Sequence, residues 1–103
     1  MAKKVINIET EKIIAGLKNY KLNSPFRERI IELGLFGSFA NNSNVKRSDI
    51  DIFLKLESAR MFDLVDIKKD LEKLFHKKVD IIVIRKTMNP YLRKQIEKNG
   101  IYV

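Results

Sequence analysis

The sequence contains no cysteine, only four glycines and two prolines, and no long apolar run. Without cysteine the chain can form neither a disulfide nor a thiolate metal site. No apolar stretch approaches the roughly 18 residues that suggest a membrane-spanning helix. The first residues, MAKKVINIETEK, lack the apolar segment of a secretory signal. We therefore expect a cytoplasmic protein that makes no membrane contact.

The scarcity of glycine and proline also leaves little material for linkers, and the chain shows no repeat and no low-complexity tract. Its 103 residues, 45% of them hydrophobic, are enough for one core and too few for two. We therefore expect a single domain over residues 1–103.

Basic residues outnumber acidic ones, with 21 Lys and Arg against 13 Asp and Glu, which gives a net charge of +8. Such a charge favours anionic partners, which include nucleic acids, nucleotides and acidic proteins. No RNP-like aromatic motif, zinc finger or Gly-Arg tract accompanies it. Direct nucleic-acid binding is therefore not expected, although a gel shift with a steep salt dependence would revive it.

Three helices are predicted before residue 80. Residues 9–20 carry apolar side chains at helical spacing. In the segment 23–33, Ser24 as N-cap and Pro25 at the first helical position indicate a second helix. Residues 59–76 have an apolar stripe opposite charged residues, and Ser58 is their expected N-cap.

The remaining elements are mostly extended. The segment LGLFGS is expected to be a strand, and residues 48–56 and 78–84 alternate or are rich in β-branched residues, as strands are. A last helix is expected between Asn89, its N-cap, and Gly100, its stop signal, with Pro90 at the first helical position. Residues 101–103 are expected to follow as a short edge strand. The expected order is α-α-β-β-α-β-α with a terminal strand. This order predicts an α/β (α+β) fold, a small mixed β-sheet packed with helices.

Two aspartates interrupt the apolar pattern at the start of the 48–56 strand. Side chains at positions i and i+2 of a strand share a face, so Asp49 and Asp51 project together, with roughly 7 Å between their Cα atoms. Two ionised carboxylates this close repel each other, and a hard divalent cation such as Mg²⁺ or Mn²⁺ removes that penalty. Asp80 is a third acid, just inside the start of the 78–84 strand. If the two strands are neighbours, the three carboxylates converge.

A Gly-Ser turn stands upstream of these acids. Gly37 lets the backbone turn sharply and approach a ligand, and the hydroxyl of Ser38 with nearby amides can hold phosphate oxygens. A phosphate-binding turn followed by metal-binding acids is suited to phosphoryl or nucleotidyl transfer. The alternative readings are a plain turn and a solvated strand start, although Asp is disfavoured in strands.

The pattern of these residues resembles the polymerase-beta-like nucleotidyltransferase superfamily. It consists of Gly37-Ser38, ten intervening residues, Asp49-Ile50-Asp51 and a later Asp80. The short length and the wording FGSFA…SDIDIFL are similar to the minimal nucleotidyltransferases (MNT). Those proteins are typically the antitoxin half of a toxin–antitoxin pair whose toxin is a helical HEPN ribonuclease. The resemblance covers most of residues 25–103.

The resemblance implies a role for each matching residue. Gly37 and Ser38 would hold the β- and γ-phosphates of ATP. Asp49 and Asp51 would bind two Mg²⁺ ions, or Mn²⁺, and Asp80 would be a third metal ligand and a base. The implied reaction transfers AMP from ATP to a hydroxyl and releases pyrophosphate. The implied acceptor is a tyrosine of the HEPN toxin, which the modification silences.

One difference from the family pattern lies in the turn. Ala40 is followed by Asn41-Asn42, where the family often has Arg-Gly. Asn adopts the left-handed conformation more readily than most residues, but a cation that would face phosphate is lost at Asn41. This difference favours an alternative function, an antitoxin that blocks its toxin sterically without catalysis. A third alternative is nucleotidyl transfer to a small-molecule alcohol, although such enzymes usually carry an extra helical domain.

Overall fold

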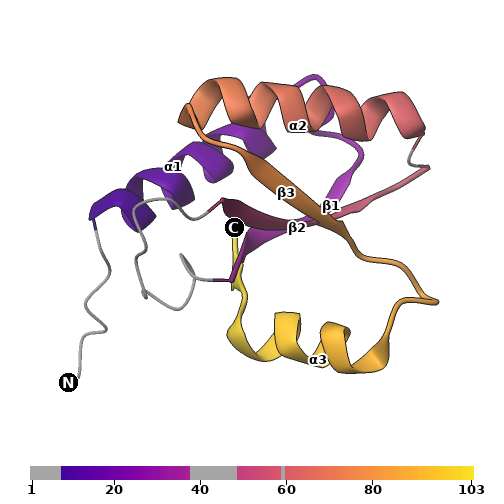
Figure 1. The fold of residues 1–103 in the computed structure, drawn as a ribbon. Helices are drawn as coiled ribbons and strands as arrows, with labels where there is room; N and C mark the ends of the chain where they lie inside the picture. The colour runs from indigo at the N-terminus through magenta and orange to yellow at the C-terminus, as the bar shows by residue number, and fades with distance from the viewer. Residues whose placement is uncertain (1–7, 38–48, 59) are drawn as a thin grey trace.

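The computed structural model describes residues 8–37, 49–58 and 60–103, and this part of the chain contains three helices and four strands (Figure 1). The order along the chain is α-β-β-α-β-α-β. The elements are α1 (Ile8–Asn23), β1 (Ile30–Phe36), β2 (Ile50–Leu56), α2 (Met61–Phe75), β3 (Val79–Val83), α3 (Pro90–Asn99) and β4 (Ile101–Tyr102).

The four strands form one sheet in the order β3-β2-β1-β4. Strand β1 is antiparallel to both of its neighbours, β2 and β4, while β2 and β3 are parallel. The parallel pair needs a crossover, and α2 supplies it between the two strands. The expected mixed sheet packed with helices is therefore confirmed, as is the short edge strand at the C-terminal end.

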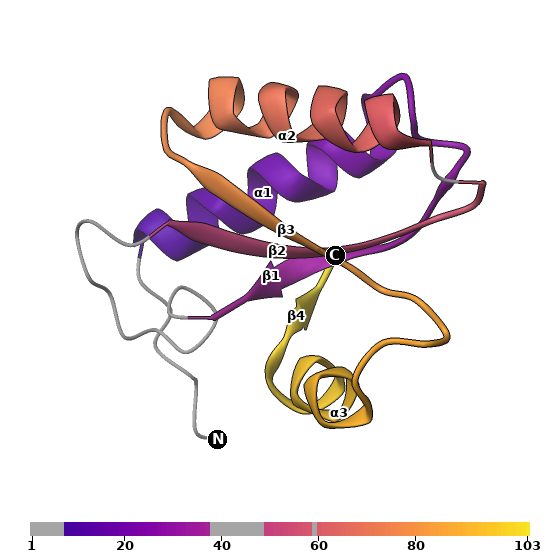
Figure 2. The same ribbon diagram turned by 45° about the vertical axis from the view of Figure 1, so that its right-hand side comes forward.

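Helices α1 and α2 cover one face of the sheet, and α3 lies on the other (Figure 2). Between α1, α2 and the sheet lies the larger core, in which Leu17, Ile52 and Leu71 are fully buried. A smaller core under α3 joins Phe53 to Ile84 and Ile96. Strand β2 is therefore apolar on both faces, as a central strand of a covered sheet must be.

The predicted helix over residues 23–33 is wrong. Pro25 begins a turn in which the Ser24 hydroxyl accepts a hydrogen bond from the amide of Phe26 at 3.2 Å, and β1 starts at Ile30. Ser24 and Pro25, the predicted helix start signals, therefore begin a turn and not a helix. Because β1 pairs with strands on both sides, sheet formation outweighs the local helical preference.

The start of α2 also differs from the prediction. Ser58 lies in the left-handed region, with φ of 53°, and Arg60 is the N-cap instead. The Asp63 carboxylate accepts a hydrogen bond from the Arg60 amide at 3.1 Å, which replaces the expected serine cap. By contrast, Asn89, Pro90 and Gly100 bound α3 as predicted, and the Asn89 side chain accepts a hydrogen bond from the amide of Tyr91.

None of the helices in the described ranges is long and apolar enough to cross a membrane.

Candidate active site

The alternation of β2 places Asp51 on the face of the sheet opposite Ile50 and Ile52. Ile50 and Ile52 point into the core shared with α1 and α2, whereas Phe53 packs on the α3 face. Successive side chains of a strand point to opposite faces, so Asp51 lies on the α3 face with Phe53. It sits at the start of β2, where a partly exposed carboxylate does not disturb either core.

Asp80 occupies the matching position on β3. In the parallel register of the two strands, Asp51 and Asp80 are direct Cα partners. Two hydrogen bonds fix this end of the pair: the Ile50 amide donates to the Lys78 carbonyl at 3.0 Å, and the Val79 amide donates to the Glu72 carboxylate at 3.0 Å. The prediction that the two strands are neighbours is confirmed, and the structure brings Asp51 and Asp80 side by side.

Gly37 lies at the same end of the sheet, directly after strand β1. Phe36, the last residue of β1, pairs with Asp51, so the following Gly37 lies against the carboxylate. Its φ is +76°, and a Cβ built there would stand 2.3 Å from Oδ2 of Asp51. Both the backbone conformation and the close approach require glycine. This contact gives a physical reason why the Gly-Ser turn has glycine at position 37, which the spacing of the residues alone does not provide.

The carboxylates influence one another electrostatically. Burial raises the pKa of Asp51 above its usual range, and the charges of Asp80 and Asp49 raise it further. Asp49 is exposed and directly precedes β2. That Asp49 and Asp51 act together in one site stays a prediction.

Several predicted features fall outside the described residues. Ser38, the second residue of the predicted phosphate turn, is among them, as are Ala40 and Asn41-Asn42. The proposed roles of these residues stay predictions.

The donor chemistry of the site fits a hard divalent cation, because it consists of carboxylate oxygens. The charges of Asp80 and Asp49 add to the effect of burial on the pKa of Asp51, and a bound cation would offset that contribution. As the side chains lie, however, no three His, Cys, Asp or Glu residues in the described part are arranged to hold one ion. The assignment of Asp49, Asp51 and Asp80 as a three-ligand set therefore stays a prediction.

Two further residues near the acids escaped sequence reasoning. Glu72 anchors the start of β3 from the end of α2, and Lys68 shares with Asp80 a groove of about 300 Å³ between α2 and β3. Both belong to the polar side of an amphipathic helix, whose pattern does not distinguish a solvated charge from one near a site. Only the packing of α2 beside β3 reveals them.

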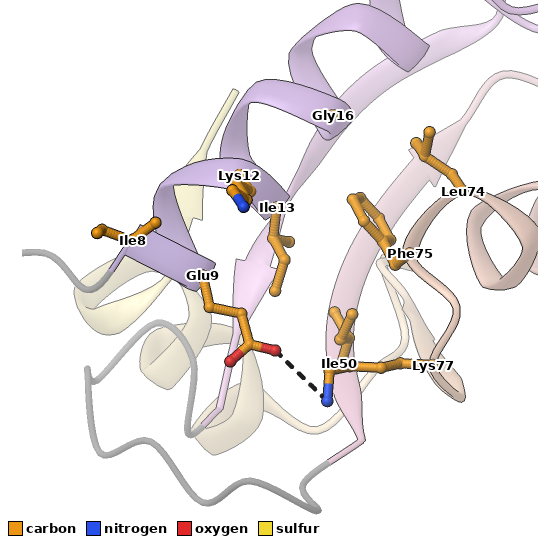
Figure 3. A pocket seen from close by; sticks show the side chains of 9 residues that line it. All are labelled: Ile8, Glu9, Lys12, Ile13, Gly16, Ile50, Leu74, Phe75 and Lys77. Carbon is orange, nitrogen blue, oxygen red and sulfur yellow. Dashed lines mark ion pairs between the residues drawn. The ribbon is translucent and has the colours of Figure 1, made fainter.

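A larger hollow, of about 620 Å³, lies on the opposite face of the sheet (Figure 3). Its lining includes Ile13 of α1, Phe75 of α2 and Ile50 of β2, and an ion pair of 3.4 Å joins Glu9 to Lys77 beside it. Ile50 points into this hollow, whereas the neighbouring Asp51 points to the other face. The hollow is therefore separate from the carboxylates.

The model of the polymerase beta nucleotidyltransferase family matches residues 11–103. Two relatives from Methanocaldococcus jannaschii, each named putative protein adenylyltransferase, are each 32% identical to the chain, over 88 and 91 residues. Each match covers 84% of this chain and 90% of the relative. The matched region thus contains the whole candidate site.

Solved structures share the fold. A putative minimal nucleotidyltransferase has a TM-score of 0.65 at 26% identity, covering 89% of this chain and 86% of its own. A toxin–antitoxin structure with AMP-PNP has a TM-score of 0.66 at 22% identity, covering 90% and 70%. A tri-AMPylated Shewanella oneidensis HEPN toxin in complex with its MNT antitoxin gives 0.62 at 18% identity, covering 92% and 71%.

The last two similarities show the fold alone, because their sequence identities are low. The family match is the stronger finding, since it spans nearly the whole chain and agrees with the Gly37, Asp51 and Asp80 arrangement. The resemblance drawn from the sequence is thereby confirmed, and the chain belongs to the polymerase beta nucleotidyltransferase family.

Proposed function

We propose that the chain is an antitoxin that transfers AMP from ATP to a hydroxyl of a HEPN toxin, with tyrosine as the acceptor. Two relatives are named as putative protein adenylyltransferases, and one solved structure with the same fold contains an AMPylated HEPN toxin with an MNT antitoxin. These findings support the proposal by likeness. The chain's own site supports it by chemistry.

The observation that carries the proposal is the register of β2 and β3. It sets Asp51 beside Asp80, and Gly37 lets the backbone come close to the Asp51 carboxylate. A cation held by these carboxylates would therefore lie within reach of a phosphate bound at Gly37. This is the arrangement that nucleotidyl transfer needs, because the triphosphate and its counter-charge must meet at one place.

Asp49, Asp51 and Asp80 would hold Mg²⁺, which when bound neutralises triphosphate charge and orients the phosphate oxygens. Gly37 would offer its backbone to the β- and γ-phosphates, and Ser38 its hydroxyl. Lys68 is a nearby cation that can attract the anionic nucleotide to this end of the sheet.

In the proposed step, the acceptor oxygen forms a bond to the α-phosphorus of ATP. The bond from that phosphorus to the oxygen bridging to the β-phosphate breaks, and pyrophosphate leaves with its electron pair. The hydroxyl proton passes to a carboxylate of the site, for which Asp80 is the candidate. The products are an AMP ester of the acceptor and pyrophosphate.

The test is the intact mass of HEPN-domain proteins from the source organism, each co-expressed with this chain. The wild type should add whole AMP units to one of them, and the combined Asp49→Asn and Asp51→Asn variant should add none. A matched control combines Glu11→Gln with Asp66→Asn, which removes two exposed carboxylates elsewhere and should leave the modification intact.

Equal modification by the aspartate variant would refute the proposed site. Neutralisation of a bound toxin that never gains mass would instead support the alternative, a sterically acting antitoxin.

A further inference from the structure

The net positive charge of the described chain is concentrated at its C-terminal end. Residues 84–103 carry five basic side chains and one acidic one, whereas the other described residues carry 12 of each. The five are Arg85, Lys86, Arg93, Lys94 and Lys98. The excess charge of the described part therefore belongs to the β3–α3 connection and to α3, and it is not spread over the surface.

The fold turns these charges outward. On its inner side, α3 packs Leu92 and Ile96 against Phe53 and Ile84. Lys94 and Lys98 are exposed, and among the helices of the described ranges only α3 lies on this face of the sheet (Figures 1 and 2). The helix therefore presents a basic surface to solvent.

A groove of about 340 Å³ continues this surface at the start of α3. It is lined by Arg85, Lys86, Met88, Pro90 and Arg93. Arg85 and Lys86 are exposed, and no ion pair found among the described residues includes either of them.

The third cation that lines the groove, Arg93, is partly neutralised. Arg93 pairs with Glu97 at 2.8 Å, so it contributes less to the attraction of an anion. The positive charge of the groove therefore rests mainly on Arg85 and Lys86.

Two apolar residues line the groove together with these cations, and an exposed aromatic residue follows them in the chain. Met88 and Pro90 form part of the groove wall, and Tyr91, the next residue after Pro90, is 71% exposed. Single-stranded nucleic acids bind where cations follow the backbone and an accessible aromatic ring stacks on a base. A basic groove followed by an accessible ring therefore favours a nucleic acid as the occupant.

We propose that the groove and the outer side of α3 bind a single-stranded nucleic acid such as RNA, with Arg85 and Lys86 on phosphates and Tyr91 stacked on a base. The surface is separate from the candidate active site, because Asp80 lies at the start of β3 and Arg85 follows its end. RNA binding therefore does not depend on the proposed transfer of AMP.

The experiment measures binding of a fluorescent single-stranded RNA of about 12 nucleotides by the full chain across a range of salt concentrations. The variant that combines Arg85→Ser with Lys86→Ser should bind at least tenfold more weakly. Its plot of log affinity against log salt should be shallower by about 1.4, as expected for two lost phosphate contacts. Tyr91→Ser should weaken binding about tenfold and leave the slope unchanged.

The matched control combines Lys12→Ser with Lys18→Ser, two exposed lysines of α1 on the other side of the molecule, and should change affinity less than twofold. An equal loss in the control would overturn the proposal in favour of diffuse charge. Competition by polyglutamate as effective as that by unlabelled RNA would overturn it in favour of an acidic protein partner. Absence of binding by the wild type at low salt would also overturn it.

Discussion

Asp51 and Asp80 are direct partners in the parallel register of β2 and β3, and each begins a strand whose later residues are apolar. Their placement brings like charges together at one end of the sheet, and these charges add to the burial that raises the pKa of Asp51. We predict that the pair binds a cationic ligand, because a cation would offset the repulsion between the two carboxylates.

Mg²⁺ should stabilise the wild-type protein through these carboxylates. At a concentration 100 times its dissociation constant, a ligand that binds only the folded state adds about 2.7 kcal/mol to the free energy of unfolding. Asp51→Asn should lose most of this gain and, without Mg²⁺, should melt at a temperature no lower than the wild type, because the substitution removes a repelled charge. Thermal melts with Mg²⁺ and with EDTA measure both effects. A Mg²⁺ response that survives Asp51→Asn would contradict the prediction.

Gly37→Ala should damage both stability and transfer. A side chain in the left-handed region costs about 1–2 kcal/mol, and the added methyl group would press on the Asp51 carboxylate. Gly16→Ala is the comparison, because its methyl group would meet the Phe75 ring on the other face of the sheet. Urea unfolding and AMP transfer should separate them: Gly16→Ala changes only stability. Full transfer by Gly37→Ala would show that the close approach is unimportant.

The ion pair between Arg29 and Asp63, at 2.6 Å, should contribute to stability except in acid. The hydrogen bond from Arg29 lowers the pKa of Asp63, so its contribution is complete above the unfolded value near 4 and disappears as pH falls through the lower folded value. The deficit of Asp63→Asn relative to the wild type should therefore be constant from pH 5 to 7 and shrink below about pH 4. Urea unfolding at several pH values measures it. Asp66→Asn on the same helix serves as the control, and an equal pH-dependent deficit there would refute the assignment.

The packing of α1 should be tested by two leucines of the same helix. Leu17 is fully buried, whereas Leu22 is 71% exposed. Leu17→Ala should cost about 2–5 kcal/mol in the free energy of unfolding, since it leaves a cavity between α1 and the sheet. Leu22→Ala should cost less than about 0.5 kcal/mol. Similar losses for both would mean that α1 does not pack as described.

The sequence predicted this fold where local pattern and tertiary environment agree. The β-branched run of β3 and the Asn89-Pro90 start of α3 are examples, because each element satisfies its own preference in place. The helix predicted at Pro25 is wrong because Ser and Pro start turns as well as helices. Only the pairing of β1 with its neighbouring strands decides between the two conformations. Within α2, Val65 and Leu74 are 43% and 44% exposed whereas Ile67 is fully buried, so the apolar pattern alone does not tell which of its side chains reach the core.

The carboxylates of the candidate site could be proposed from the sequence, whereas the geometry that joins them could not. Strand periodicity predicted that Asp49 and Asp51 share a face, but the partnership of Asp51 with Asp80 depends on the register of a parallel pair. The contact of Gly37 with Asp51 likewise depends on β1 pairing beside β2. Such long-range pairings leave no local signal in the sequence.

The most direct test of the central claim is the rate of AMP transfer to the co-expressed HEPN protein by Asp80→Asn. Asp80 is the residue that the strand register, rather than motif spacing, joins to the site. We predict that its rate falls about 100-fold or more below the wild type, while Asp66→Asn stays within twofold. A rate for Asp80→Asn within twofold of the wild type would contradict the claim that the Asp51–Asp80 pair is the centre of nucleotidyl transfer.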